Sequence, residues 1–445
     1  MWRCCGAVVQ AKIWVAGALI ALAGCGQPAG QRGAPAAAEA NADLRHAVSD
    51  PRVARFYEGR GWQSAWSRES EQALLAAIGE ADHHALDKDA FLRPIQQAPR
   101  GAAHDAALSL AAISYAEALA RGKTDPTRLQ EVYTVPRPNP NLAAGLAGAL
   151  RAGNVGDWLR GLAPQDSEYR ALSEAYLAAN REITAATQHP EGSPQRRAAT
   201  PAIDRARALA VNLERRRWLE RTPPATRIDV NTAAATLAYL RDGQVADVRR
   251  AVVGDPEHQT PQLGSPLFRL AANPTWTVPH SIEQAEIVPK GEAYMRRNNM
   301  EWRNGQIVQK SGPKNSLGLV KFDLRNDEQI YLHDTPAKAL FSRAERHESH
   351  GCVRVQDALG FARLIAADQG VLDAWEEARE KDEESFVTLP HPIPVRLLYQ
   401  TAFVDGGRIV FAPDVYGWDE DVAQALGLPA RPRRAAAARH GDVGP

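Results

Sequence analysis

The spacing of apolar residues changes at Thr222-Pro223-Pro224, and this change constrains the fold more than any other feature of the chain. Before the prolines, apolar residues recur every three or four positions, which places them on one face of a helix. The clearest case is residues 104–122, where this face would carry Leu108, Ala111, Tyr115, Ala118 and Leu119. Residues 71–86, 167–187 and 202–219 show the same pattern, so this half of the chain predicts a helical domain.

After the prolines the apolar residues alternate, as in strands with one buried face. Residues 237–254 predict a hairpin about Asp242-Gly243, residues 321–334 predict two short strands, and residues 394–411 predict a hairpin about Asp405-Gly406-Gly407. One further helix is expected over residues 355–370. We therefore expect an α+β chain, with a helical domain over residues 49–220 and a β-rich domain over residues 223–420.

Charge and length narrow the class of protein. The 445 residues include 53 basic and 53 acidic side chains, so the formal net charge is zero. A protein that binds nucleic acid through its phosphates needs a basic excess, and we expect no nucleic-acid partner. The length suits two to three domains of ~100–200 residues each.

The N-terminal segment predicts export and lipidation. Arg3 and Lys12 precede an apolar run over residues 13–23, which is too short to span a bilayer and is typical of a secretory signal. The run ends in Leu22-Ala23-Gly24-Cys25, which resembles a bacterial lipobox. We expect residues 1–24 to be a lipoprotein signal peptide and Cys25 to carry lipid; the alternative is a simple signal with a chance cysteine.

The two ends of the mature chain predict little structure. Residues 25–48 are small and polar, with proline and glycine, which favours a flexible tether. Residues 421–445 predict a disordered tail. Gly26 stands where aspartate would retain a lipoprotein at the inner membrane, so by convention we expect a periplasmic protein anchored to the outer membrane.

Cys352 is the one thiol that export and lipidation would leave unmodified, and its neighbours suit a nucleophile. It ends the run Ser349-His350-Gly351-Cys352, and His333 lies 19 residues earlier, beside Asp334. A thiol nucleophile needs an imidazole base and a group that orients that base, and both histidines are available. The amides of Gly351 and Cys352 are candidates for an oxyanion hole.

Two other interpretations of these residues stay open. Cys352 is either a nucleophile or an inert core thiol. His333, His347, His350 and Cys352 also form a candidate zinc set, but their spacing matches no usual zinc pattern, so we expect no metal and no organic cofactor.

The run from Ser349 to Arg354, with His333 upstream, resembles the signature of the L,D-transpeptidase family, whose catalytic module is the YkuD-type β domain. Further segments resemble its large YcbB-like branch, which carries a helical scaffold domain. These segments are RGKTDP at 121–126, NLERRRWL at 212–219, NPTWTVPHSI at 273–282, SGPKNSLGLVKFDL at 311–324, IYLHDTP at 330–336 and DVYGWD at 414–419.

The resemblance implies a role for each matching residue. Cys352 would attack the carbonyl of the third residue of a peptidoglycan tetrapeptide stem, releasing D-alanine, with His333 as general base. Ser349, His350 and Gly351 would form the oxyanion side. Arg354 would hold a substrate carboxylate or brace the loop, Asp334 would contact substrate, and Tyr331 and Trp276 would shape the cleft or belong to the core. Carbapenems would acylate Cys352.

The resemblance leaves the acceptor open. A transpeptidase passes the acyl group to an amine of a second stem and so builds the cell wall and its shape, whereas a carboxypeptidase or cross-link hydrolase passes it to water. A non-catalytic envelope scaffold, recruiting other cell-wall enzymes through the helical domain, is a third reading. The chain departs from the branch at two places: the peptidoglycan-binding module is replaced by a loop at 189–201, and the capping segment at 289–310 is short.

Overall fold

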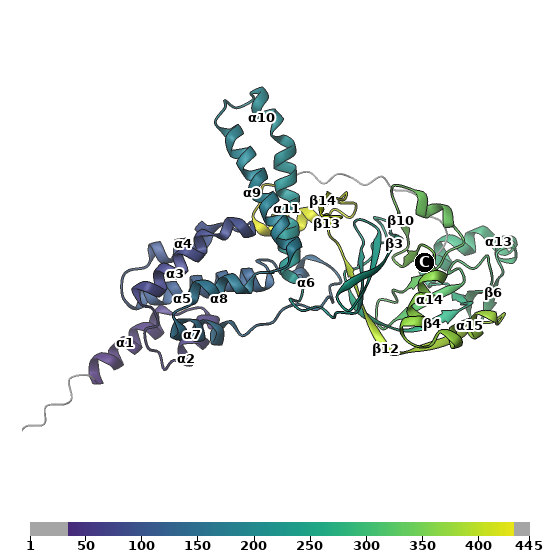
Figure 1. Ribbon diagram of the computed structural model, residues 1–445, viewed down its shortest axis with the longest axis horizontal. Coiled ribbons are helices and arrows are strands. Elements are labelled where there is room, and N and C mark those ends of the chain that lie inside the picture. Colours follow the sequence, from purple (N-terminus) through teal and green to yellow (C-terminus); the bar gives the residue numbers. More distant parts are fainter. Residues whose placement is uncertain (1–33, 431–445) are drawn as a thin grey trace, which may run out of the picture.

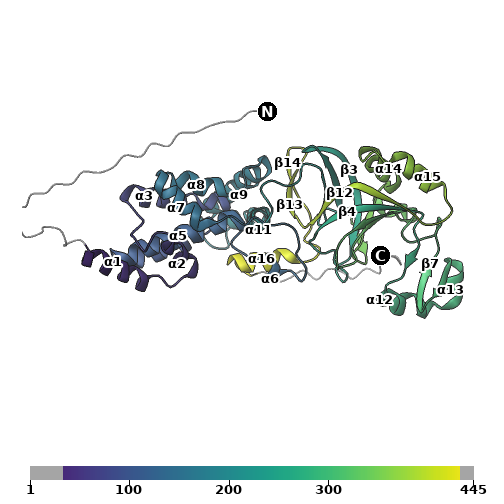
Figure 2. The same ribbon diagram turned by 90° about the horizontal axis from the view of Figure 1, so that it is seen from below.

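The computed structural model describes residues 34–430, which form a helical domain and a β domain side by side along the longest axis (Figures 1 and 2). This arrangement confirms the predicted α+β class and the order of the two parts. The signal peptide and Cys25 lie outside the described residues, so their predictions remain expectations. No helix among residues 34–430 is long and apolar enough to cross a membrane.

Helix α5 (Ala102–Arg121) lies at the centre of the helical domain and is buried along most of its length. The apolar positions predicted for this segment, among them Leu108, Tyr115 and Leu119, are all in the core. The other elements are α1 (Ala34–Ala47), α2 (Pro51–Glu58), α3 (Arg68–Gly79), η1 (Ala81–His84), α4 (Lys88–Gln97), α6 (Pro126–Leu129), α7 (Leu142–Ala152), α8 (Val155–Leu162), α9 (Ser167–Thr187), α10 (Pro194–Ala198) and α11 (Thr200–Trp218).

Two of the motifs in this domain pack against each other. Gly122 ends α5 with a φ of +88°, and a Cβ at this position would lie 2.6 Å from Oε1 of Glu214 on α11. Thr124 donates to the same oxygen through its amide at 2.6 Å and its hydroxyl at 2.7 Å. A residue larger than glycine would therefore separate the C-terminal end of α5 from α11.

Helices α9 and α11 form a long antiparallel hairpin that projects from the body of the molecule (Figure 1). The loop expected at 189–201 is the tip of this hairpin. It contains the short helix α10, which begins at Pro194 after a Ser193 cap. The place where relatives are expected to carry an extra module is thus occupied by one turn of helix and its flanking turns.

The β domain is built on a nine-stranded sheet whose order is β10-β3-β11-β9-β8-β4-β12-β1-β2. An additional pairing of β2 with β3 closes the sheet on itself, which leaves β10 attached at β3. The strands are β1 (Arg227–Asn231), β2 (Thr236–Arg241), β3 (Gln244–Gly254), β4 (Gly264–Ala272), β8 (Val320–Leu324), β9 (Leu332–His333), β10 (His347–Ser349), β11 (Val353–Val355) and β12 (Ser385–Leu398).

Helices α14 (Ala358–Asp368) and α15 (Leu372–Glu380) pack on this sheet. Helix α14 lies within the segment 355–370 where a helix was expected, and Asp357 caps it by accepting from the amide of Gly360. Phe361 and Ile365 of α14 are fully buried against the sheet, together with Phe322 of β8. The helix covers one side of the strands that carry the candidate site.

Residues 276–310 form a small lobe with its own core, although the sequence predicted only a short capping segment at 289–310. Trp276, Ile287 and Met300 are buried within it. The lobe lies at the far end of the molecule from the helical domain (Figure 2). Its elements are β5 (Trp276–Thr277), α12 (His280–Ile282), η2 (Glu283–Ile287), η3 (Val288–Lys290), α13 (Gly291–Arg297), β6 (Met300–Arg303) and β7 (Gln306–Gln309).

After β12 the chain returns to the helical domain. The hairpin β13 (Ala402–Asp405) and β14 (Arg408–Phe411) packs against α9 and α11, and α16 (Trp418–Leu426) packs against α11. Val422, Ala423 and Leu426 share a buried cluster with Trp218. The predicted disordered tail at 421–445 is therefore wrong for its first residues, because their apolar side chains complete this cluster.

The predicted tether also begins to fold earlier than expected. Residues 34–47 of the predicted tether at 25–48 form α1, which packs against α5. Leu44 anchors the helix in the core. A single buried leucine in an alanine-rich polar segment was too weak a signal to predict a helix.

Candidate active site

A cavity of about 840 Å³ opens between the β domain and the lobe, and Cys352 lies in its wall. The lobe supplies one side, including Trp276 and Glu286, and the sheet supplies the other, including Tyr331. Its charged lining groups include Arg269 and Lys321 together with Asp323, Glu286, Glu328 and Glu384. The cavity is therefore polar and carries both signs of charge.

The candidate base ends β9, and the candidate nucleophile directly precedes β11, the strand beside it. Parallel β9 and β11 pair Leu332 with Val353 and His333 with Arg354. Continuing this register by one residue places Cys352 beside Tyr331, on the same face of the sheet as His333. The amide of Val353 donates to the carbonyl of Tyr331 at 3.1 Å and fixes that alignment.

His333 is fully buried, and its orientation is set by main chain. Its Nδ1 donates to the carbonyl oxygen of Asp334, which leaves Nε2 as the ring nitrogen able to accept a proton. The Tyr331 ring lies edge-on to the imidazole, with centroids 5.7 Å apart. The orienting group expected for the base is thus a peptide carbonyl rather than a carboxylate.

The carboxylate of Asp334 faces away from the cavity. It accepts from the amide of Leu319 at 3.0 Å and pairs with Lys338. A Cβ at Gly318 would lie 2.3 Å from this carboxylate, so the glycine is required for the contact. Asp334 therefore supports the loop before β8, and it does not line the cavity as a substrate contact would.

Arg354 likewise lies beneath the site. Its side chain is buried, with 1% of the residue exposed, and it is absent from the cavity wall. Of the two roles expected for it, the burial favours bracing the loop over holding a substrate carboxylate. Tyr331 and Trp276 both line the cavity while belonging to buried clusters, so each shapes the cleft from the core.

Ser349 and Thr260 hold the turn that presents Cys352. Ser349 Oγ donates to the carbonyl of Cys352 at 2.6 Å and accepts from the amide of Gly351 at 3.3 Å. Thr260 Oγ1 donates to the carbonyl of Gly351 at 2.8 Å. Gly351 has a φ of +109°, which disfavours any side chain there. Because its amide is directed at Ser349, Gly351 contributes the shape of the turn.

His350 connects the turn to the lobe. Its Nε2 lies 2.5 Å from Oε1 of Glu286 in η2, and its ring lies 4.5 Å from the ring of His258. His258 is in turn held by Asp255, 3.1 Å from its Nδ1. His350 thus pairs with a carboxylate of the lobe and lines the cavity, whereas His333 is fully buried and, like Asp334 and Arg354, does not line it.

Burial raises the pKa of the Cys352 thiol to about 11. Hydrogen bonding from Tyr331 and the positive charges of Lys321 and Arg354 oppose this effect without overcoming it. Burial also raises the pKa of Tyr331 well above its usual range, and the neighbouring thiol adds to the rise. The resting thiol is therefore protonated at neutral pH, so its attack on a carbonyl requires a base.

The sequence did not single out several residues of this site. Thr260, His258, Glu286 and Lys321 were all missed, because each is polar in a segment where surface exposure is the ordinary expectation. One signal was available: Asp255 and His258 follow the buried end of β3 directly, where polar side chains meet the edge of the sheet. No group of three or more histidine, cysteine, aspartate or glutamate side chains among residues 34–430 is arranged to hold a metal ion.

Comparison with known proteins assigns both parts of the chain. Residues 225–372 match the L,D-transpeptidase catalytic domain (YkuD), and residues 51–175 match a domain described as a scaffold domain. Residues 225–372, which include the candidate site, are therefore an L,D-transpeptidase catalytic domain by this match. The resemblance drawn from the sequence motifs is thereby confirmed.

A relative from Haemophilus influenzae matches most of this chain. It is named provisionally as an L,D-transpeptidase and is 25% identical over 429 residues, covering 86% of this chain and 82% of the relative. The similar solved structures include the L,D-transpeptidase of Mycobacterium smegmatis, with 15% identity, a TM-score of 0.24, and coverage of 39% of this chain and 58% of that one. A mutant of the Enterococcus faecium L,D-transpeptidase is 13% identical, with a TM-score of 0.21. The match covers 40% of this chain and 52% of that one.

Proposed function

We propose that this protein is a cysteine L,D-transpeptidase that acts on the stem peptides of peptidoglycan. One observation carries the proposal: the buried Cys352 thiol lies in the wall of the cavity, directly before the strand that pairs with the strand of His333, in a domain that matches the family's catalytic module. No metal or organic cofactor is needed for the reaction.

The first step forms a thioester. Cys352 Sγ attacks the carbonyl carbon of the third stem residue while His333 takes the thiol proton. The tetrahedral intermediate then breaks its C–N bond, and His333 returns the proton to the leaving nitrogen, which departs as D-alanine. The raised thiol pKa makes this base essential, because little thiolate is present beforehand.

The second step releases the acyl group to an acceptor. An amine of a second stem attacks the thioester carbon, His333 takes its excess proton, and Cys352 leaves and is reprotonated. A 3-3 cross-link results. The acidic side chains that line the cavity suit an incoming ammonium group, and Glu286, Glu328 and Glu384 are three of these.

Hydrolysis is the second candidate, since water can replace the amine at the same thioester. The lobe favours transfer, because it walls the cavity opposite Cys352 and limits access of bulk water. An amine held in place can reach an effective molarity of ~10⁵ M, which exceeds that of liquid water.

We further propose that the protein works in the bacterial periplasm, held to a membrane by lipid on Cys25 and sorted to the outer membrane. The lipobox-like run and the absence of aspartate at position 26 support this proposal. A triacylated N-terminus would anchor durably, whereas a single chain would not. Cys25→Ser should leave unprocessed precursor or soluble protein in cell fractions, and wild-type protein found only in the soluble periplasm would contradict it.

The test of the enzyme is mass spectrometry of muropeptides after incubation with disaccharide-tetrapeptides. We expect dimers joined between third residues, with one D-alanine released for each. Tripeptide monomers that account for all released D-alanine would identify a carboxypeptidase instead. If there is no turnover and no acylation by a carbapenem, the chain is a non-catalytic scaffold.

A further inference from the structure

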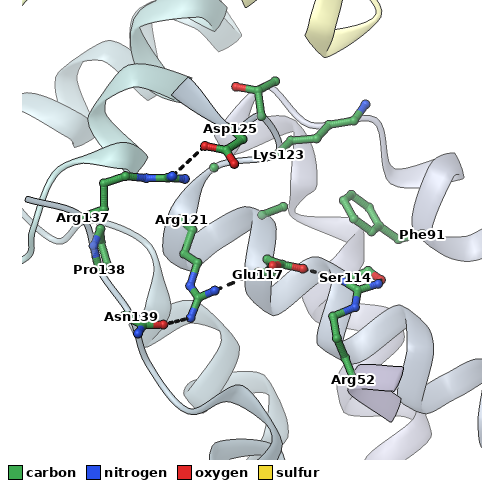
Figure 3. Close-up of a pocket in the computed structure, with 13 residues that line it drawn as sticks. Arg52, Phe91, Ser114, Glu117, Arg121, Lys123, Asp125, Arg137, Pro138 and Asn139 are labelled. Atoms are coloured by element: carbon green, nitrogen blue, oxygen red, sulfur yellow. Dashed lines mark hydrogen bonds and ion pairs between the residues drawn. The ribbon is translucent and has the colours of Figure 1, made fainter. Parts of the chain in front are cut away.

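The RGKTDP motif divides its side chains between two directions. Gly122, Thr124 and Pro126 are buried against the helical core. Arg121, Lys123 and Asp125 are more exposed and line a cavity of about 580 Å³, which Gly122 and Thr124 also reach (Figure 3). Lys123 in addition donates to the carbonyl of Leu426 at 3.2 Å. The packing against Glu214 explains the inward residues, but it does not explain the outward ones.

A second cavity, of about 710 Å³, adjoins the first, because Arg52, Glu117, Arg121 and Asn139 line both. We call the two together the scaffold trough. Its extent along α5 suits an elongated ligand better than a single small ion.

The scaffold trough is strongly basic on a chain whose net charge is zero. Its only acidic lining groups among the described residues are Glu117 and Asp125. Its basic lining groups are Arg52, Arg55, Arg121, Lys123, Arg137 and Arg151. This excess of positive charge indicates a negatively charged ligand.

Neighbouring side chains hold two arginines of the scaffold trough in fixed orientations. Arg121 lies between Glu117 and Asn139, and Arg137 donates to Asp125 at 2.7 Å (Figure 3). The Nε groups of Arg121 and Arg137 are buried and have no hydrogen-bond partner within the described residues. Because these Nε groups are buried, only the terminal nitrogens can meet a ligand, and the contacts above pre-orient them, as expected of groups that bind carboxylates.

Neutral groups in the trough suit a sugar. Ser114, Asn139 and Asn141 offer hydroxyl and amide groups, and Phe91 and Pro138 add apolar surface. A lipid headgroup would instead be met by exposed lysines on an open surface. The mixture of arginine, amide, hydroxyl and ring in a hollow fits an acidic oligosaccharide.

We propose that the scaffold trough binds peptidoglycan strands, through their sugar rings and the carboxylates of their stems, and so holds the polymer on the helical domain. This proposal rests on the proposed function, which makes peptidoglycan the substrate. It also supplies a binding surface for a chain in which the hairpin tip replaces the expected binding module.

The test is co-sedimentation of the full mature chain with purified sacculi, using three double variants. Lys123→Gln/Arg137→Gln changes the first cavity, and Arg55→Gln/Arg151→Gln changes the second, where both arginines are exposed. The matched control is Arg93→Gln/Arg181→Gln, which removes two exposed charges of the same domain that do not line the trough. Melting curves identify any variant that fails to fold.

We expect each trough variant to bind sacculi about tenfold more weakly, the loss of one or two charge-assisted contacts, and the control to bind within about twofold of wild type. A neutral N-acetylglucosamine hexamer should compete poorly for the same protein. Wild-type binding by both folded trough variants, or an equal loss in the control, would overturn the proposal.

Two further measurements separate the alternatives. Binding to vesicles of equimolar phosphatidylethanolamine and phosphatidylglycerol tests whether the trough binds lipid headgroups. If the trough variants lose vesicle binding while their sacculus binding is unchanged, the proposal is overturned in favour of a lipid site. Turnover of soluble disaccharide-tetrapeptide should be equal in wild type and trough variants. Absence of turnover in wild type would refute the proposed function, while the sacculus result would still decide the trough.

Discussion

The two domains each bury a cluster of polar side chains, but only one cluster reaches a cavity. In the helical domain, Arg217 pairs with Glu214 at 2.6 Å and donates to the Tyr169 hydroxyl at 2.9 Å, and that hydroxyl lies 3.0 Å from Nδ1 of His84. None of these four lines the cavities described above. In the β domain, Cys352 is as deeply placed, yet it lies in a cavity wall.

The comparison shows that burial of ionisable groups does not by itself mark an active site. Burial lowers the pKa of His84 to about 3 and raises that of Cys352 to about 11, so both groups are neutral at pH 7. The helical cluster pairs its charged groups with one another and fastens η1, α9 and α11 together. The β-domain cluster leaves one reactive atom facing a space that a substrate can enter.

The largest effect is expected from a substitution that removes the nucleophile of the β-domain cluster. Cys352→Ala should lower turnover by ~10⁴-fold or more, because the nucleophile is lost while substrate binding remains. Its melting temperature should stay within a few degrees of wild type, since only one sulfur is removed. Steady-state kinetics with a melting curve make the check, and substantial activity in the folded variant would rule out Cys352 as nucleophile.

A smaller loss is expected at the base. His333→Gln should slow carbapenem acylation by ~10²–10⁴-fold, the usual contribution of a general base. His350→Gln is the matched control, because His350 pairs with Glu286 in the lobe. Stopped-flow acylation rates distinguish the two, and an unchanged rate in His333→Gln would transfer the role to His350.

Breaking the buried polar cluster of the helical domain should lower the stability of the fold and leave the rate of the reaction unchanged. Glu214→Ala leaves Arg217 buried without its carboxylate and should lower the free energy of unfolding by about 3–5 kcal/mol. The exposed Glu174 on α9 provides the control, and Glu174→Ala should be neutral to within about 0.5 kcal/mol. Denaturant unfolding measures both. A Glu214 variant as stable as wild type would mean that the cluster does not hold the helices together.

The smallest effect concerns pH. The folded pKa of His84 is lowered, so the unfolded chain takes up a proton that the folded chain does not, and stability should fall as pH drops below about 6.5 toward 3. His84→Asn should remove about 1–3 kcal/mol of that loss between pH 7 and 4.5, whereas His83→Asn, at the exposed neighbour, should not. If the free energy of unfolding has the same pH dependence in wild type, His84→Asn and His83→Asn, then His84 does not cause the loss of stability at low pH.

Local patterns made much of the fold predictable. The Asp242-Gly243 and Asp405-Gly406-Gly407 turns are present, with positive φ at each of these residues except Asp405, and Asp357 caps its helix. The sequence placed the strand before the second turn too early: β12 ends at Leu398 in the closed sheet, and the hairpin of β13 and β14 belongs to the helical domain. Alternation marks a strand but not the sheet that it joins.

The site was predictable where chemistry is local in sequence. Residue type and spacing single out Cys352, His333 and the Ser349–Gly351 turn, and their catalytic roles stay predictions. The roles of Arg354 and Asp334 could not be predicted, because a charged side chain can either support a loop from a buried position or contact substrate. Only the register of β9 and β11 distinguishes these two roles. Glu286 was missed because it reaches His350 from 64 positions earlier in the chain.

The return of the chain to the helical domain affects the order in which the protein can fold. Helix α11 buries Val211 and Trp218 against α16, which is made from nearly the last residues of the described chain. During synthesis the helical domain emerges first, yet this apolar face stays uncovered until the β domain has followed. The two domains must therefore complete folding together. Cutting the chain at the domain boundary would expose the apolar surfaces of α11 and α16 that cover each other in the intact protein.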